Sequence, residues 1–393
     1  MRKYVTSTTA FILLVFWPTM AQEVATQVQP PAPERVLSAF ETDYLSQLRR
    51  YGRDLDAQGL YVESLDGSVV LADHHSRGSF NPASVIKIAT SFAALDKLGP
   101  EYHFETTFEA VGEIKRSTRT LEGDLVLSST GDPKLTTIQV NRLIQQVVRA
   151  GVTKVTGSLI VTGPFTYAGF LSTDAAIKKL EALLKKQGVR IGKGTKRGPA
   201  TGVVLATYLN PESLREIIFE QNAHSDNRIA ERLGDAIGGP KAVTRFLIKD
   251  VGIPEREISL QRTSGLDQNR ITPQGTVKLL RHLVLWLNFN NLLPQDVLPV
   301  AGVDGGTLRA RFTAIDYRGS VIGKTGTLPA TDGGVSTLAG FVFTRDRGVL
   351  LFAIFNTHGN VTTFRRLQDS LIKDMIEESG GAELSASLRK ASN

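Results

Sequence analysis

The sequence predicts an α+β fold, in which a five-stranded antiparallel sheet is flanked by helices and joined to a helical lobe and a small β-rich inserted subdomain. Strand-like segments near both ends of the chain predict the sheet. A mainly helical stretch over residues 213–303 predicts the lobe. With 393 residues, 41% of them hydrophobic, the chain is long enough for more than one domain-sized unit.

The first 21 residues have the pattern of a secretory signal peptide. Arg2 and Lys3 precede an apolar run at 10–17 that is too short to span a membrane, and small residues follow it. Residues 22–35 contain three prolines and little apolar surface, which predicts a flexible leader. We therefore expect residues 1–21 to direct export across the cytoplasmic membrane, to the periplasm or the cell-wall space.

The composition excludes several kinds of site. There is no cysteine, which removes disulfides, thiolate nucleophiles and zinc–cysteine centres. The six histidines show no metal-ligand spacing, so neither a metal nor another cofactor is expected. The formal net charge of +7 has two interpretations of equal weight. It can aid solubility alone, or it can attract anionic polymers and lipid headgroups. At most peripheral membrane contact is expected, and no nucleic acid partner.

The main sheet begins with a hairpin. From Val36 the apolar residues follow helical spacing, and strand-like segments at 59–65 and 68–72 then flank an Asp-Gly turn. Three more strands are predicted near the other end of the chain, followed by an amphipathic helix over 362–378. These strands are 319–328, 336–344 and 349–356. The two terminal helices each need a surface to cover, which predicts one sheet with the chain ends close together.

An inserted subdomain is predicted over residues 105–171, where strand-like segments at 122–127 and 157–162 surround a helix. The helix predicted over 174–187 and the glycine- and lysine-rich stretch 192–198, predicted to be an exposed turn, are assigned to the main domain. The main domain would therefore comprise residues 36–104 and 172–393.

A serine stands three residues before a lysine where an apolar run becomes helical. On a helix, positions i and i+3 share a face, so the Ser84 hydroxyl and the Lys87 amine would lie within hydrogen-bond reach. Serine is a weak nucleophile at neutral pH, and a partly desolvated lysine can act as its base. Taken alone, S-x-x-K is common, and a buried helix with one serine near its start is the simpler interpretation.

Two further motifs follow in order, S-D-N at 225–227 and K-T-G-T at 324–327. Each arises often by chance, but the ordered set rarely does. The trio is typical of serine β-lactamases and penicillin-binding proteins. The set therefore favours a catalytic site over the simpler interpretation of Ser84 and Lys87.

With these motifs in place, the chain resembles the serine D-alanyl-D-alanine carboxypeptidases and endopeptidases of the class C low-molecular-mass penicillin-binding proteins, the penicillin-binding protein 4 type. The resemblance covers most of residues 36–378 and implies a penicillin-binding transpeptidase/β-lactamase-like main domain. Further matching segments are G-D-L-V-L at 123–127, G-D-P-K-L at 131–135, S-G-L at 264–266, N-R-I-T-P at 269–273 and P-V-A-G-V-D at 299–304. The family usually has a longer insertion, whereas only 141 positions separate Ser84 from Ser225 here, which puts endopeptidase action on cross-links in doubt.

The resemblance implies a D,D-carboxypeptidase that acts on peptidoglycan stem peptides and is acylated by β-lactams. Ser84 would attack the penultimate carbonyl of a peptide that ends in D-Ala-D-Ala, and neutral Lys87 would take its proton. Burial beside Lys324 would depress the pKa of Lys87. Ser225 would relay a proton to the departing D-alanine, and Asn227 would hold Lys87 and a substrate amide.

The K-T-G-T segment would bind the other end of the substrate. Lys324, Thr325 and Thr327 would receive the terminal carboxylate. Gly326 would let the substrate backbone approach the strand closely. By resemblance, the oxyanion hole would consist of the backbone N–H groups of Ser84 and Thr327.

Two rival functions are considered. A serine β-lactamase shares all three motifs but needs a base for deacylation, for which Glu212 and Glu220 are candidates. A non-enzymatic penicillin-recognising wall protein is the second rival, and the intact trio argues against it. His224, Asp226 and Asp304 are interpreted as structural residues.

Overall fold

The computed structural model describes residues 33–169 and 172–384. The predicted signal peptide and most of the predicted leader therefore lie outside the described residues. Within the described ranges, no helix is long enough and apolar enough to cross a membrane.

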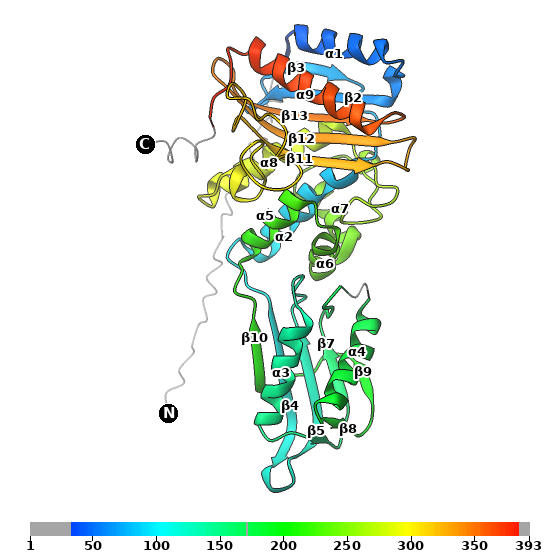
Figure 1. Ribbon diagram of the computed structural model, residues 1–393, viewed down its shortest axis with the longest axis vertical. Coiled ribbons are helices and arrows are strands. Elements are labelled where there is room, and N and C mark those ends of the chain that lie inside the picture. The colour runs from blue at the N-terminus through cyan, green and yellow to red at the C-terminus, as the bar shows by residue number, and fades with distance from the viewer. Residues whose placement is uncertain (1–32, 170–171, 385–393) are drawn as a thin grey trace, which may run out of the picture. The chain divides into compact units, whose positions relative to one another are not determined.

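The main sheet joins the two ends of the described chain, in the order β1-β3-β2-β13-β12-β11 (Figure 1). Its strands are β1 (Glu34–Arg35), β2 (Gln58–Ser64), β3 (Val69–His74), β11 (Val321–Leu328), β12 (Val335–Thr344) and β13 (Gly348–Asn356). Five of them form the predicted antiparallel arrangement, with β2 and β13 paired at its centre. The sheet has one short strand more than the five predicted. This strand, β1, consists of two residues from the predicted leader and pairs in parallel with β3.

One face of this sheet is covered by the terminal helices α1 (Ala39–Arg50) and α9 (Val361–Glu378), as Figure 1 shows. Both helices are amphipathic, and their apolar faces share a core with the sheet. The core includes Phe40, Tyr44 and Leu48 from α1, Phe364, Leu371 and Met375 from α9, and Val62, Leu338 and Phe352 from the strands. Each such side chain contributes about 1.5–3 kcal/mol when fully buried, so this layer anchors both chain ends.

The helical lobe packs on the other face and is built around α2 (Lys87–Leu98), whose residues 87–95 are all buried. Its other helices are α5 (Leu214–His224), α6 (Asn227–Ile237), α7 (Gly239–Lys249) and α8 (Pro273–Phe289). A helix buried on every side needs apolar or small residues all round, which accounts for the mixture of apolar and small residues that follows Lys87. The start of α2 is thereby fixed at the centre of the main domain.

The inserted subdomain is a second sheet, with the path β10-β4-β5-β6-β8, while β7 pairs with β5 and β9. Its strands are β4 (Glu105–Lys115), β5 (Thr120–Ser129), β6 (Lys154–Val155), β7 (Leu159–Thr162), β8 (Arg190–Ile191), β9 (Thr195–Arg197) and β10 (Val203–Leu209). Two helices, α3 (Thr137–Arg149) and α4 (Thr173–Lys186), share its core.

The predicted end of this subdomain at residue 171 is therefore wrong, because α4 and the strands β8 to β10 belong to the same sheet and core. The stretch 192–198, predicted to be an exposed turn, includes β9, which pairs in parallel with β7. The subdomain spans residues 105–209. It leaves the main domain through β4 and returns through β10, which are antiparallel neighbours that pair Glu105 with Leu209.

Candidate active site

Ser84 lies on a short 3-10 helix, η2 (Ala83–Ile86), that precedes α2, where a continuous α-helix was predicted. The turn is strained, because Ala83 has a φ of 46°, a region that non-glycine residues rarely adopt. Two contacts hold it. The Asn81 Oδ1 accepts the Ala83 N–H at 3.0 Å, and a Cβ on Gly265 would lie 2.0 Å from the Ala83 carbonyl oxygen. The turn thus presents a half-buried Ser84 at the start of α2.

Lys87, the first residue of α2, is fully buried and reaches three oxygens. Its Nζ lies 2.9 Å from the Ser84 Oγ, 2.7 Å from the Asn227 Oδ1 and 2.5 Å from the Ser264 carbonyl oxygen. The amide and carbonyl oxygens can only accept hydrogen bonds, so each takes one N–H. In the neutral amine the lone pair is left facing the Ser84 hydroxyl, the one partner that can donate a proton.

Burial lowers the pKa of Lys87 to about 7, because the ammonium form loses its hydration. The carboxylates of Glu231 and Asp226 oppose this effect by attracting the positive charge. A pKa near neutrality means that the amine and the ammonium forms are both populated at pH 7. Lys87 can therefore accept a proton and give it back.

The corner between α5 and α6 carries the second motif. Ser225 ends α5 in the left-handed conformation, with a φ of 58°. Asp226 then caps α6, because its carboxylate accepts the backbone N–H groups of Arg228 and Ile229 at 2.7 and 3.1 Å. Asn227 is the first residue of α6 and faces Lys87. The cap thus fixes the direction in which Asn227 points.

Lys324 lies on β11 and is fully buried, with its Nζ donating to the carbonyl oxygen of Thr325 at 2.8 Å. Its pKa is lowered well below the usual value, first by burial and then by the positive charge of Lys87. Burial is what lowers the pKa of Lys87, so the predicted contribution of Lys324 to that shift stays a prediction.

The two threonine hydroxyls of the third motif each have a partner. Thr325 Oγ1 donates to the Thr307 hydroxyl at 2.8 Å. Thr327 Oγ1 accepts a hydrogen bond from the Arg365 guanidinium at 2.9 Å. Because the guanidinium occupies a lone pair of this oxygen, the Thr327 O–H is free to donate elsewhere.

Gly326 lies where β11 packs tightly against the Ser84 turn, and its predicted role in admitting the substrate backbone stays a prediction. A Cβ at this position would lie 2.1 Å from the Thr337 Oγ1 and 2.7 Å from the Pro82 carbonyl oxygen. The Thr337 hydroxyl donates to that same carbonyl at 2.8 Å. The space is thus filled by the protein itself, so glycine is needed for β11 to pack against the Ser84 turn. This packing places Ser84 and Thr327 on neighbouring elements, and their shared oxyanion role stays a prediction.

Sequence reasoning missed four groups at the site. Glu231 lies one helical turn after Asn227, and its carboxylate accepts the Ser264 N–H at 3.0 Å, so the i+4 spacing was the available signal. The Ser264 carbonyl belongs to the S-G-L segment at 264–266, whose sequence gives no sign of a contact with Lys87. Thr307 and Arg365 reach the site through tertiary packing alone, and no local pattern marks them.

The residues considered as structural or rival groups have other contacts. His224 is exposed, and Asp304 accepts a backbone N–H within its own turn at 2.7 Å. Glu212 and Glu220, the candidate lactamase bases, both form ion pairs with Lys134 of the inserted subdomain. In the ranges that the structure describes, no group of three histidine or carboxylate side chains is placed to hold a metal ion.

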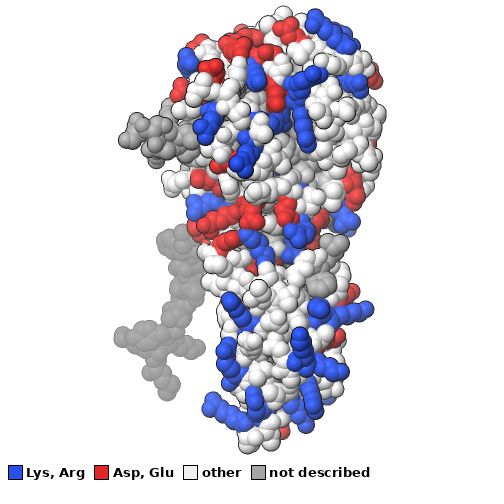
Figure 2. Space-filling model, viewed as in Figure 1, with Lys and Arg blue, Asp and Glu red and all other residues white. Residues whose placement is uncertain are grey.

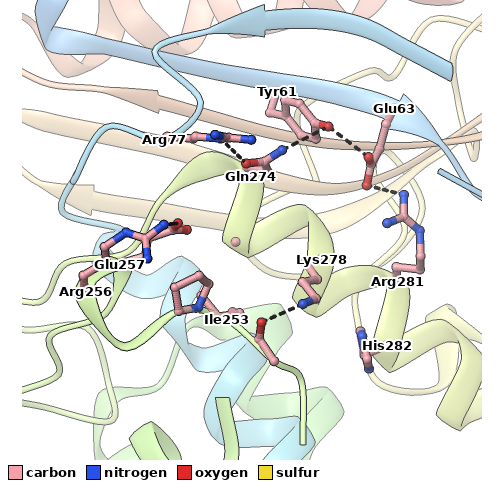
Figure 3. A pocket seen from close by; sticks show the side chains of 13 residues that line it. Tyr61, Glu63, Arg77, Ile253, Arg256, Glu257, Gln274, Lys278, Arg281 and His282 are labelled. Carbon is pink, nitrogen blue, oxygen red and sulfur yellow. Dashed lines mark hydrogen bonds and ion pairs between the residues drawn. The ribbon is translucent and has the colours of Figure 1, made fainter. Parts of the chain in front are cut away.

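Two cavities differ in their relation to this site. One of about 610 Å³ adjoins it and is lined by Asn227, Glu231 and Leu266, among others. Another of about 400 Å³ lies between β2 and α8 and contains none of the motif residues (Figure 3). Its polar side chains bind one another, since the Tyr61 hydroxyl bridges the Gln274 amide and the Glu63 carboxylate. We interpret that second cavity as structural.

The architecture is similar to that of solved structures. The structure of penicillin binding protein 4 (dacB) from Haemophilus influenzae matches with a TM-score of 0.67 and 22% identity, over 82% of this chain and 96% of that one. A predatory peptidoglycan endopeptidase from Bdellovibrio bacteriovorus matches with a TM-score of 0.63 and 18% identity, over 83% and 94% of the two chains. These likenesses confirm the predicted fold class.

Sequence comparisons agree with the fold. D-alanyl-D-alanine carboxypeptidase DacB of Haemophilus influenzae is 29% identical over 103 residues, which are 26% of this chain and 21% of that protein. The match thus spans about a fifth of the length of that relative. The family model for D-Ala-D-Ala carboxypeptidase 3 (S13) matches residues 46–168 and 164–371, which confirms the resemblance drawn from the motifs. The chain belongs to the D-Ala-D-Ala carboxypeptidase 3 (S13) family.

Proposed function

We propose that this protein is a serine D,D-carboxypeptidase that acts outside the cytoplasmic membrane on peptidoglycan stem peptides. It removes the terminal D-alanine through an acyl-enzyme on Ser84. The observation that carries the proposal is the contact set of Lys87: among its partners in the described ranges, the Ser84 hydroxyl is the one that can donate a proton. Membership of the S13 family supports the same reaction.

The acylation step follows from this geometry. The Ser84 oxygen attacks the carbonyl carbon of the penultimate D-alanine while its proton passes to the neutral amine of Lys87. The oxyanion that forms would be held by the backbone N–H groups of Ser84 and Thr327, with about 3–4 kcal/mol from each donor. The C–N bond then breaks, and the proton on Lys87 returns through Ser225 to the leaving D-alanine nitrogen.

Deacylation reverses the roles. Water attacks the ester carbonyl, Lys87 accepts a proton from it, and Ser84 leaves as the free hydroxyl after that proton returns. A β-lactamase would need an efficient base for this step. Glu212 and Glu220 are each paired with Lys134, so these candidates are engaged away from such a role. This favours slow hydrolysis of the ester that β-lactams form with Ser84, and it argues against their rapid turnover.

A free carboxylate at the end of the substrate suits the third motif. It would restore a counterion to the buried Lys324 and accept the hydroxyl proton of Thr327, and the Thr325 hydroxyl would join it by turning away from Thr307. β-Lactams carry a comparable carboxylate, and structural neighbours are described as complexed with a β-lactam and as acylated by penicillin G. We infer that β-lactams bind this chain at the same place.

Cleavage of cross-links is a second candidate activity, because other structural neighbours are described as endopeptidases. The cavity of about 610 Å³ beside Asn227 would give part of a branched peptide room next to the trio. Comparing D-alanine release from a linear pentapeptide with cleavage of a cross-linked dimer would rank the two activities.

The proposal is tested by intact mass during incubation with excess benzylpenicillin, with D-alanine release from a stem pentapeptide followed in parallel. We expect a long-lived adduct that maps to Ser84 and D-alanine release that the Ser84→Ala variant loses while it keeps its melting temperature. Unmodified protein with penicillin consumed would indicate a β-lactamase. Unmodified protein with penicillin intact would indicate a non-catalytic protein.

A further inference from the structure

The inserted subdomain carries the whole basic excess of the chain. Residues 105–209 contain 15 Lys and Arg against eight Asp and Glu, and the rest of the chain has 31 of each kind. Figure 2 shows this concentration as many blue and few red side chains over the subdomain. An anionic surface would therefore attract the molecule through this subdomain rather than through the main domain.

Nearly all of these cations face solvent without a local counterion. Fourteen of the 15 are exposed, Lys134 being the exception. In the described residues, only three of those fourteen lie within 4.0 Å of a carboxylate, namely Lys115, Lys196 and Arg197. The remaining eleven charges are thus available to an external partner.

Six of the available cations gather where α3 and α4 end, and we call them the basic end surface: Arg119, Arg149, Lys154, Lys185, Arg190 and Lys193. The sheet brings them together. Lys154 is in register with both Thr120 and Arg190, and the Arg119 guanidinium donates to a carbonyl in the last turn of α3 at 2.8 Å.

Local structure explains only part of this surface. Arg149 and Lys185 stand in the last turns of helices, where a cation stabilises the helix dipole. Lys154, Arg190 and Lys193 lie on short strands and a turn, where no such effect operates. Helix stabilisation therefore does not account for these three cations.

We propose that the basic end surface docks on a membrane surface rich in anionic phosphate headgroups. Among the residues of the subdomain that the structure describes, the exposed large apolar side chains lie elsewhere, on β4, on β10 and in the first turn of α3. The basic end surface thus presents charge without exposed large apolar side chains. Such a surface suits contact with lipid headgroups, and its binding should depend strongly on salt concentration. Its cations come from several separate elements, and mobile lipid headgroups can gather around such a spread of charge more easily than one stiff polymer strand.

The test is sedimentation of the full chain with vesicles of phosphatidylcholine, with and without phosphatidylglycerol. A fourfold variant reverses charge at Lys154→Glu, Lys185→Glu, Arg190→Glu and Lys193→Glu. A matched control, Arg50→Glu, Lys241→Glu, Lys249→Glu and Arg309→Glu, changes exposed cations of the main domain by the same total charge. Residues 1–32 are common to all three proteins, so any contribution from them cancels.

At low salt we expect the subdomain variant to lose at least about 100-fold in its partition onto anionic vesicles, since each cation near such a surface contributes about fivefold. The control should lose less than about fivefold. All three proteins should release D-alanine from a soluble pentapeptide equally, which shows that the fold is intact. Equal losses in both variants, equal binding to neutral vesicles, or binding to soluble polyphosphate but not to vesicles would each overturn the proposal.

Discussion

Lys87 and Lys324 are both fully buried at the same site, yet the regions around them differ. Lys87 reaches oxygens from three separate segments and lies near the carboxylates of Glu231 and Asp226, which hold its pKa near 7 against the cost of burial. Lys324 donates to a carbonyl of its own strand, and Lys87 lowers its pKa further.

Burial alone therefore does not assign a role to a lysine. The surroundings of Lys87 support both of its protonation states, which is what a general base needs. The surroundings of Lys324 disfavour its charge until an anion arrives, which suits the binding of a carboxylate. The two regions should therefore respond differently to substitution, to substrate charge and to pH.

The largest effect is expected at Lys87. Lys87→Met should lower kcat/KM for D-alanine release about 10³- to 10⁴-fold, because it removes the general base while it fills the same space. The rate of acylation by benzylpenicillin, measured by mass, should fall in parallel. A variant that acylates at the normal rate would show that another group activates Ser84.

Lys324→Ala should distinguish between substrates rather than abolish chemistry. We expect kcat/KM for a peptide with a free carboxylate to fall about 100-fold, because a desolvated charge-assisted contact is lost. The already poor hydrolysis of the matching C-terminal amide should change little. Equal losses of kcat/KM on both peptides would show that Lys324 does not bind the carboxylate and that, like Lys87, it acts in the reaction itself.

Gly326→Ala should lower the free energy of unfolding by about 1–3 kcal/mol, because its methyl group would press on Thr337 and Pro82 where β11 meets the Ser84 turn. Urea denaturation would measure this loss. Gly198→Ala is the control, since nothing lies within 4 Å of its added Cβ. Normal stability with lost activity would instead support the expectation that Gly326 admits the substrate backbone.

The smallest effect is expected at Arg365. Arg365→Ala should raise KM for the free-carboxylate peptide about three- to tenfold with little change in kcat, because it no longer orients the Thr327 hydroxyl. Arg365→Lys should restore part of the loss. Arg366→Ala, whose guanidinium lies 4.9 Å from the centre of the Tyr51 ring, is the control and should leave KM unchanged.

Much of the main domain could be predicted because its signals are local. The hairpin of β2 and β3 and the three long C-terminal strands have clear boundaries, and the i, i+3 spacing placed Ser84 beside Lys87. The boundary at 171 failed because β6, β8 and β9 are only two or three residues long, too short to show alternation.

The details of the site needed the tertiary structure. A strained 3-10 turn at Ala83 depends on Asn81 and Gly265, which are far apart in sequence. The packing role of Gly326 could not be predicted, because the atoms that crowd it come from another strand and another turn. Such contacts follow from packing and leave no periodic pattern in the chain.

If neutral Lys87 activates Ser84, the rate of acylation must depend on pH. The amine must be unprotonated to accept the serine proton, so the second-order rate of benzylpenicillin adduct formation should rise as pH increases through about 7 and level off above it. Well below that pKa, the rate of adduct formation should fall about tenfold for each unit by which the pH decreases. A rate that stays constant from acid to alkaline pH, with Ser84 still the acylated residue, would contradict the account.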